Sequence, residues 1–151
     1  MGWGKSGRRS VGWIAVGVAW ACIPLATSGQ DVATAQRWLD HLAAVLAEDA
    51  DSTDVDALLS MYHPYAAYEH PAVGARIEGI AALRAGRMSY LGQTRRPRLD
   101  DVEILTGPGV VALSYRLTME ARSGDDWTPV ERSTLVVLEF DGDRIVRVID
   151  H

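Results

Sequence analysis

The stretch Met61-Tyr-His-Pro-Tyr-Ala-Ala-Tyr-Glu-His-Pro71 decides the fold prediction. Its two X-Pro dipeptides bias the residue before each proline away from helix, so residues 66–70 between them are predicted to form a short strand. On a strand, Tyr68 and His70 point to the same side, whereas Glu69 points to the opposite side. We predict that the Tyr68 and His70 side lines a pocket.

Two amphipathic helices are predicted before this strand. Over residues 35–49 the apolar residues recur at i, i+1, i+4, i+7 and i+8, which forms one stripe of a helix. These residues are Trp38, Leu39, Leu42, Val45 and Leu46. His41 lies at the border of that stripe. Ser52 or Thr53 is expected to cap a second, short helix whose inward face ends in Tyr62.

A third helix is predicted over residues 78–91, and a charged residue interrupts its apolar face. The inward positions are Ile80, Leu83, Arg87 and Leu91. Either Arg87 extends its guanidinium to the rim, or it reaches into a cavity and meets an acid or a substrate anion. Both readings remain open from the sequence.

From Leu99 onward the hydrophobic pattern has period two, which predicts four long antiparallel strands joined by turns at 107–109, 123–126 and 141–142. Tyr115 lies on the apolar face of the second strand, Arg132 shares a face with Val136 in the third, and Pro129 predicts a bulge or an edge. The order predicts an α+β fold, with three N-terminal helices on one face of a strongly curved, mainly antiparallel sheet. Such a sheet encloses a conical cavity.

Residues 1–35 read as an export signal and residues 36–151 as one domain. Lys5, Arg8 and Arg9 precede an apolar run, and small residues suitable for cleavage follow, with sites after Ser28 or Ala35. The predicted location is therefore periplasmic or secreted. The alternative is an uncleaved N-terminal anchor, which would be the only membrane contact.

Composition excludes several classes of function for residues 36–151. The only cysteine, Cys22, lies in the leader, so a disulfide, a thiolate metal site and a cysteine nucleophile are not expected in the domain. The domain has 12 basic and 19 acidic residues, a net charge of −7, so nucleic acid is not an expected partner. His41, His70 and His151 lack the local spacing of a metal site, and no metal is predicted.

The order of elements from residue 36 onward, with the motif Tyr68-Glu-His-Pro71 and the hairpin at residues 141–150, resembles the SnoaL-like branch of the nuclear transport factor 2-like superfamily. That superfamily includes ketosteroid isomerases, limonene epoxide hydrolases and scytalone dehydratases. The resemblance implies a cone-shaped α+β barrel with mixed strands, a homodimer, and a pocket between the helices and the concave sheet.

The resemblance also implies where catalytic residues lie, and this chain departs from the family pattern. Isomerase-like members carry an aspartate base just before the motif proline, where this chain has His70. Their first-helix tyrosine has no counterpart, although Trp38 or His41 falls nearby. The epoxide-hydrolase arrangement needs two acids around an arginine. Arg87 could be the arginine, but the sequence places no acid convincingly on an inward face.

The sequence therefore predicts cofactor-independent proton transfer, of isomerase, cyclase or dehydratase type, on a small apolar molecule that carries a carbonyl. His70 is the predicted base, because imidazole exchanges protons near neutrality. Tyr68, Tyr115 and His41 are candidate hydrogen-bond donors, and Arg87 or Arg132 would hold a carboxylate or an enolate. Trp38 and Tyr62 are predicted binding residues. The alternative is a non-catalytic module that binds a small molecule or a protein.

Overall fold

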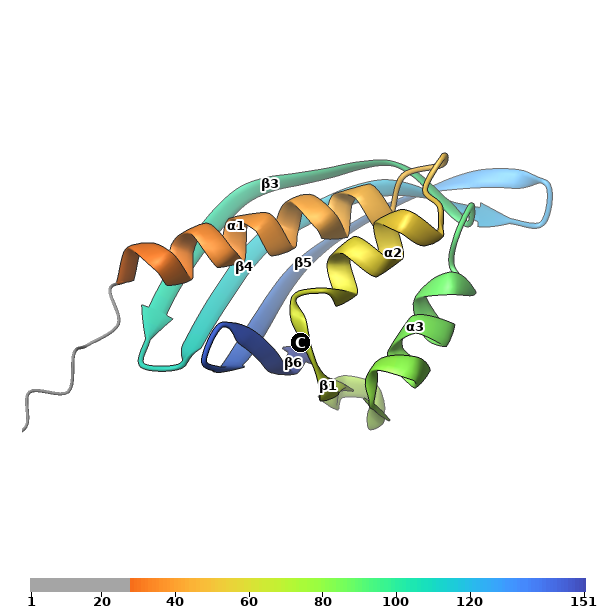
Figure 1. Cartoon of the computed structure of the whole chain (residues 1–151). Helices are drawn as coiled ribbons and strands as arrows, with labels where there is room; N and C mark the ends of the chain where they lie inside the picture. Colours follow the sequence, from red (N-terminus) through yellow and green to blue (C-terminus); the bar gives the residue numbers. More distant parts are fainter. Residues whose placement is uncertain (1–27) are drawn as a thin grey trace, which may run out of the picture.

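The computed structural model describes residues 28–151 as three helices packed on one face of a six-stranded sheet (Figure 1). The helices are α1 (Ser28–Val45), α2 (Ser52–Leu59) and α3 (Ile80–Met88), with a 3-10 turn at Pro71–Val73. The strands are β1 (Tyr62–His70), β2 (Ala75–Glu78), β3 (Thr94–Gly107), β4 (Val110–Ser123), β5 (Asp126–Asp141) and β6 (Arg144–Asp150). The predicted α+β architecture is confirmed.

The sheet is mixed because its last strand is inserted beside its first. The strand order is β2-β1-β6-β5-β4-β3, and β1 pairs with β6 in parallel while every other pair is antiparallel. β3, β4 and β5 form a long meander that bends over α1 (Figure 1). This curvature leaves room between the helices and the sheet, which is where the candidate site lies.

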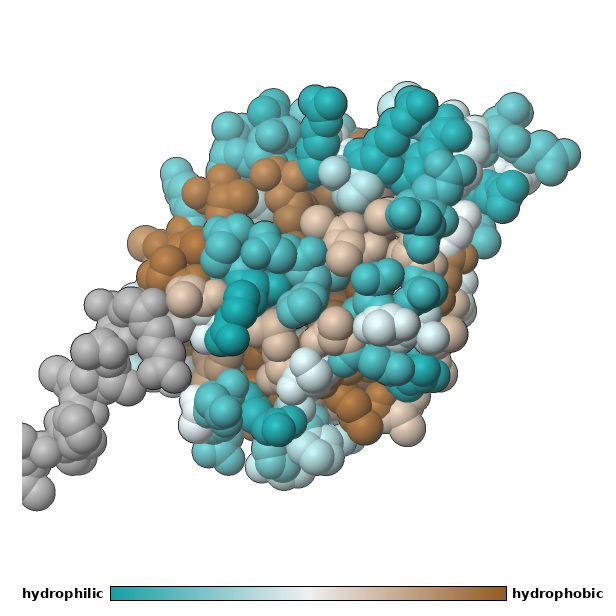
Figure 2. Space-filling model, turned by 45° about the horizontal axis from the view of Figure 1, so that its top comes forward, coloured by the Kyte–Doolittle hydropathy of each residue, from teal (hydrophilic) through white to brown (hydrophobic). Residues whose placement is uncertain are grey.

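α1 covers the sheet with the stripe predicted from the sequence. Trp38, Leu39, Leu42 and Val45 are all buried. The carbonyl of Leu46 after the helix accepts a hydrogen bond of 2.8 Å from the Thr94 hydroxyl, which joins the end of α1 to the start of β3. Hydrophilic side chains occupy much of the face seen in Figure 2, as expected for helices whose apolar stripes point at the sheet.

α2 begins at Ser52, because its N-cap is Asp51 and not the predicted Ser52 or Thr53. The Asp51 carboxylate accepts from the Thr53 amide at 2.6 Å, and the Asp54 carboxylate accepts from the Asp51 amide at 3.0 Å. These two bonds form a capping box. The predicted cap was wrong because Asp51, Ser52 and Thr53 all have side chains that can cap a helix. The backbone conformation decides which of them does so.

α3 is shorter than the predicted helix over residues 78–91. Gly79, at φ 82°, directs the chain from β2 into the helix, which ends at Met88. An ion pair of 2.7 Å between Arg84 and Asp56 joins α3 to α2. Leu91 lies after the helix and still packs against the core.

Two strands are longer than predicted. β1 starts at Tyr62 and passes through Pro64, with a shift of register relative to β6 between Tyr62 and Ala67. β3 starts at Thr94 and contains two register shifts against β4. Pro129 lies on a part of β5 that pairs only with β4, so the predicted edge is confirmed, and β4 and β5 pair there without a bulge.

The structure describes only the last part of the predicted leader. Residues 1–27, with Cys22, lie outside the described residues, whereas residues 28–35 belong to α1 and Ala35 is buried in the core. None of the helices within residues 28–151 has the length and hydropathy of a membrane span.

Candidate functional site

A small cavity lies between α1, α3 and the inner face of the sheet. Its volume is about 60 Å³. The apolar part of its wall consists of Leu42, Leu46, Leu117, Val136 and Val148. The polar part consists of Trp38, Tyr68, Arg87, Tyr115, Arg132 and Asp150. Five of these six polar residues were predicted from the sequence as site residues, and Asp150 was not.

The central contact of the cavity joins β1 to β6. The Tyr68 hydroxyl donates a hydrogen bond of 2.7 Å to Oδ2 of Asp150, whose exposed fraction is only 8%. Three causes raise the pKa of Tyr68. Burial is the largest, and the hydrogen bond to Asp150 and the charge of that carboxylate add to it. The phenol therefore remains protonated and serves as a donor at neutral pH.

Asp150 supplies the inward acid that the sequence analysis did not place. Asp150 is the last residue of the final strand, where a sequence pattern is a poor guide to the direction of a side chain. The signal that could have found it is the spacing of two between Val148 and Asp150, because residues two apart on a strand share a face. Val148 is buried in the core, so Asp150 has to face inward as well.

Two arginines approach the same cavity from different elements. Arg87 on α3 is half-buried, with its guanidinium carbon 5.6 Å from the centre of the Tyr68 ring. Arg132 on β5 is more exposed and lies at the cavity wall. Both positive charges act to lower the pKa values of Tyr68 and Tyr115. Of the two readings of Arg87, the structure therefore supports the one that reaches into the cavity.

Tyr115 on β4 is a second phenol in the cavity, only 4% exposed. Burial, followed by the negative charge of Asp150, raises the pKa of Tyr115 to about 12, against the opposing charges of Arg132 and Arg87. The site thus contains two protonated phenols, one carboxylate and two guanidinium groups. This set can donate hydrogen bonds, accept a proton and stabilise a negative charge.

Tyr62 acts on the site through Trp38. The indole Nε1 of Trp38 donates to the Tyr62 hydroxyl at 2.9 Å, and the two side chains are 2% and 3% exposed. Burial raises the pKa of Tyr62, so this hydroxyl also stays protonated. Tyr62 does not itself line the cavity, but it fixes the indole that does.

The two predicted catalytic histidines lie outside the cavity wall. His70 is half-buried at the end of β1, and its buried Nδ1 has no hydrogen-bond partner among the described residues. His41 is half-buried on α1. His63 was expected at the surface and is instead half-buried, with its ring centre 3.6 Å from that of Tyr65.

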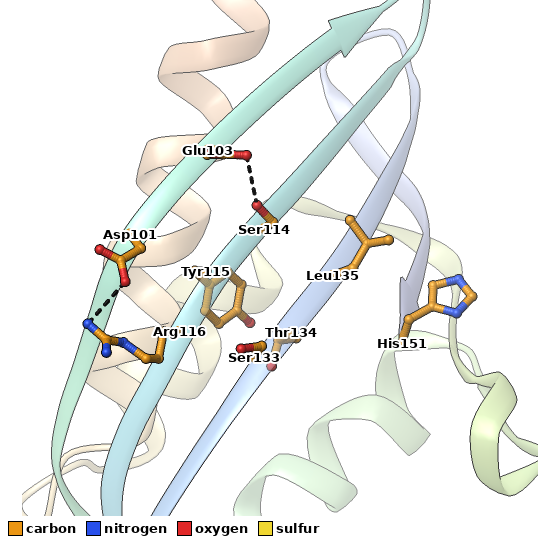
Figure 3. Close-up of a pocket in the computed structure, with 9 residues that line it drawn as sticks. All are labelled: Asp101, Glu103, Ser114, Tyr115, Arg116, Ser133, Thr134, Leu135 and His151. Atoms are coloured by element: carbon orange, nitrogen blue, oxygen red, sulfur yellow. Dashed lines mark hydrogen bonds and ion pairs between the residues drawn. The ribbon is translucent and has the colours of Figure 1, made fainter.

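A larger hollow of about 430 Å³ lies on the outer face of the sheet (Figure 3). Four of its polar residues are paired with one another, since Arg116 pairs with Asp101 at 3.0 Å and Ser114 donates to Glu103 at 3.5 Å. It opens widely to solvent, whereas the inner cavity is more enclosed and has the acid and the two arginines. The inner cavity is therefore the better candidate for a functional site.

No three potential metal ligands come together within residues 28–151. The carboxylate of Asp150 is the only acid that lines the inner cavity in this part of the chain. One carboxylate with no histidine beside it is a poor ligand set for a divalent cation.

Comparisons with known proteins agree with this architecture. A structure named as a SnoaL-like polyketide cyclase, from Shewanella denitrificans, superposes with a TM-score of 0.68 at 10% identity, covering 82% of this chain and 90% of that one. A polyketide cyclase-like structure from Pseudomonas putida gives 0.64 at 13% identity, covering 78% and 87%. A ketosteroid isomerase-like structure from Catenulispora acidiphila, in complex with trimethylamine, gives 0.61 at 15% identity, covering 78% and 83%.

These similarities in structure show the shared fold, and the sequence comparison adds the family. No curated protein matches the sequence significantly. The family model described as "SnoaL-like domain" matches residues 35–148, which is most of the chain. The chain therefore belongs to the SnoaL-like domain family.

Proposed function

We propose that this protein catalyses proton transfer at a carbon next to a carbonyl group, on a small molecule bound in the inner cavity and without a cofactor. The observation that carries the proposal is the Tyr68–Asp150 hydrogen bond of 2.7 Å in a partly apolar cavity that two arginines also line. A carboxylate next to protonated donors and positive charge is the set of groups that enolisation needs.

In the proposed reaction, Asp150 takes the proton. The substrate C–H bond breaks, its proton moves to a carboxylate oxygen, and its electron pair forms an enolate. Arg87 and Arg132 stabilise the negative charge on the enolate oxygen, and the Tyr115 hydroxyl donates to it. The proton then returns to carbon, at the same position or at another, which gives exchange or isomerisation.

The apolar wall supports the same chemistry. Leucine and valine side chains and the fixed indole of Trp38 limit the water that reaches the bound molecule. With less water, the interaction between the enolate and the guanidinium groups is stronger.

His70 remains a proposed base in competition with Asp150. It lies two residues after Tyr68 on β1, and its buried Nδ1 is free of any bond within the described residues. A substrate that extends out of the cavity along β1 would come within its reach. His41, which is half-buried on α1 and outside the cavity wall, remains a proposed hydrogen-bond donor.

Solvent deuterium incorporation tests the proposal. A panel of small ketones and β-keto esters is incubated with the protein in heavy water, and loss of the α-proton signal is followed by NMR. We expect accelerated exchange for at least one compound, a loss of about 100-fold or more in Asp150→Asn, and a small effect in His70→Phe. Loss in His70→Phe with full activity in Asp150→Asn would assign the base to His70 instead.

A binding module is the second candidate, because the two arginines and the hydrogen-bond donors around the cavity of about 60 Å³ can also hold a small molecule that does not react. The trimethylamine in the Catenulispora acidiphila structure shows that a relative of this fold holds a small molecule. Saturable binding of a compound with no exchange of its α-protons would support this alternative and contradict the catalytic proposal.

Export and self-association complete the proposal. Lys5, Arg8 and Arg9 before an apolar run support export, to be tested by sequencing the N-terminus of the protein recovered outside the cytoplasm. The outer face of the sheet, which none of the three helices of residues 28–151 covers in Figure 1, is proposed to bind a second copy in a homodimer. Light scattering of the purified protein measures this directly.

A further inference from the structure

The twelve arginines of residues 36–151 differ in what they contact. Six of them form ion pairs with carboxylates. They are Arg76, Arg84, Arg95, Arg96, Arg116 and Arg147. The other six have no ion pair with a carboxylate of residues 28–151, and of these six only Arg87 and Arg132 line the inner cavity. The cavity thus contains two cationic groups whose charge the described chain does not pair.

The only carboxylate in the cavity wall is already engaged. Asp150 accepts a hydrogen bond of 2.7 Å from the Tyr68 hydroxyl and forms no ion pair with either arginine. Counting Asp150 as an anion, the wall carries a net charge of +1. Because both guanidinium groups line the same small cavity, they repel each other, and a bound anion would relieve that repulsion.

We infer that the inner cavity recognises a small carboxylate, which Arg87 on α3 and Arg132 on β5 hold. Guanidinium groups suit this role because their planar N–H groups match the two oxygens of a carboxylate. The stacking of Arg87 on the Tyr68 ring, at 5.6 Å, limits the directions in which its guanidinium can point. This inference deepens the proposed function: if the reaction is proton transfer, its substrates are small oxo acids. The arginines then hold the carboxylate and act on the enolate through their charge, while the Tyr115 hydroxyl donates to the enolate oxygen.

The shape of the cavity limits the size of the acid. One water-sized atom needs ~10–15 Å³ of such space, so the volume of about 60 Å³ holds roughly four to six non-hydrogen atoms. The apolar wall fits a short hydrocarbon chain, and the negative charge of Asp150 keeps the carboxylate on the side of the arginines. Longer acids would extend out of the cavity mouth.

A pair of probes with the same shape and different charge tests the inference. Isobutyrate and isobutyramide are titrated separately into the protein, and binding is followed by shifts of backbone amide NMR signals. We expect isobutyrate to bind at least roughly tenfold more tightly, because hydrogen bonds to charged groups are the stronger ones. Added sodium chloride should weaken isobutyrate binding and leave isobutyramide unchanged.

Variants identify the residues responsible. Arg87→Met and Arg132→Met should each weaken isobutyrate binding by roughly tenfold and leave isobutyramide binding unchanged. Arg98→Met is the matched control, because Arg98 is exposed on β3 and lies outside the cavity wall. Arg132→Lys, which keeps the charge, should retain part of the affinity. If a variant fails to fold, the comparison of acid with amide on the unaltered protein still tests the inference.

Two results would overturn the inference: equal affinity for the acid and the amide, or a loss in Arg98→Met as large as that in Arg87→Met. The outcome for the proposed function is separate. Exchange of α-protons in neutral ketones, without binding of isobutyrate, would preserve the reaction and reject the carboxylate. Binding of isobutyrate that depends on both arginines, without any exchange, would preserve the carboxylate site and reject the reaction.

Discussion

Replacement of Tyr62 by phenylalanine measures the hydrogen bond that fixes one wall of the cavity. The variant keeps the aromatic ring, so it opens no cavity, and it removes only the hydroxyl that accepts from Nε1 of Trp38 at 2.9 Å. Both side chains are almost fully buried, at 2% and 3% exposed, so the indole N–H would lose its partner without gaining water. A buried donor left unsatisfied costs about 1–3 kcal/mol.

The expected change is large enough to measure by urea unfolding. Removal of a buried hydroxyl from an apolar setting offsets part of the loss, so we expect a net decrease of about 1–2 kcal/mol in the free energy of unfolding. With a urea m-value of about 1–3 kcal/mol per molar, the midpoint should fall by roughly 1 M at an unchanged slope. Tryptophan fluorescence and circular dichroism report the transition.

Tyr65→Phe is the matched control, since Tyr65 is 63% exposed and its hydroxyl has no hydrogen bond within the described residues. Its free energy of unfolding should stay within about 0.5 kcal/mol of that of the unaltered protein. A Tyr62→Phe midpoint equal to that of Tyr65→Phe would refute the claim that the Trp38–Tyr62 bond stabilises the fold. A double-mutant cycle with Trp38→Phe should show that the two losses are not additive.

Three further predictions concern the ends of elements, acid stability and the cavity. Asp51→Ala removes the side-chain half of the capping box and should lower the free energy of unfolding by ~1 kcal/mol in urea. The hydrogen bond to Arg147 holds the pKa of Glu69 below its ordinary value of 4.5, so its stabilisation is complete above that value and is lost as pH falls through the folded-state pKa. Glu69→Gln should therefore flatten the fall in unfolding midpoint between about pH 5 and pH 3. The pKa of Tyr115, raised to about 12, should fall in Asp150→Asn, and the ring-carbon NMR shift near pH 11 should show more phenolate than in the unaltered protein.

The sheet could be predicted because its strands follow one simple rule. In β4 every second residue from Val111 to Leu117 is buried, and the same alternation covers Thr134 to Leu138 in β5. The start of β1 was missed because Tyr62 completes the apolar pattern of the helix before it. The parallel pairing of β1 with β6 was not predicted. The two strands lie far apart in the sequence, and no local motif indicates that they are neighbours in the sheet.

The site was predicted in part for a similar reason. Trp38, Tyr68, Tyr115 and Arg132 lie on faces that the apolar pattern marks as inward, and each lines the cavity. His70 lies on the same alternation as Tyr68, but β1 ends there and the chain turns at Pro71, so period two no longer determines what its ring faces. The hydrophobic pattern predicts which way side chains point within a helix or strand, and it fails at the ends of these elements.

The position of Asp150 follows from two strand pairings, and neither is local. Asp150 pairs with Val136 on β5, while two residues earlier Val148 pairs with Tyr68 on β1, so cavity-lining residues occupy both neighbouring strands. A shift of one residue in the register of β6 would turn Ile149 inward and expose the carboxylate. The acid reaches the phenol across 82 residues of sequence only when β6 is inserted between β1 and β5 in this register. The same pairing that completes the sheet therefore assembles the candidate site, because a chain without it has neither a closed core nor an acid in the cavity.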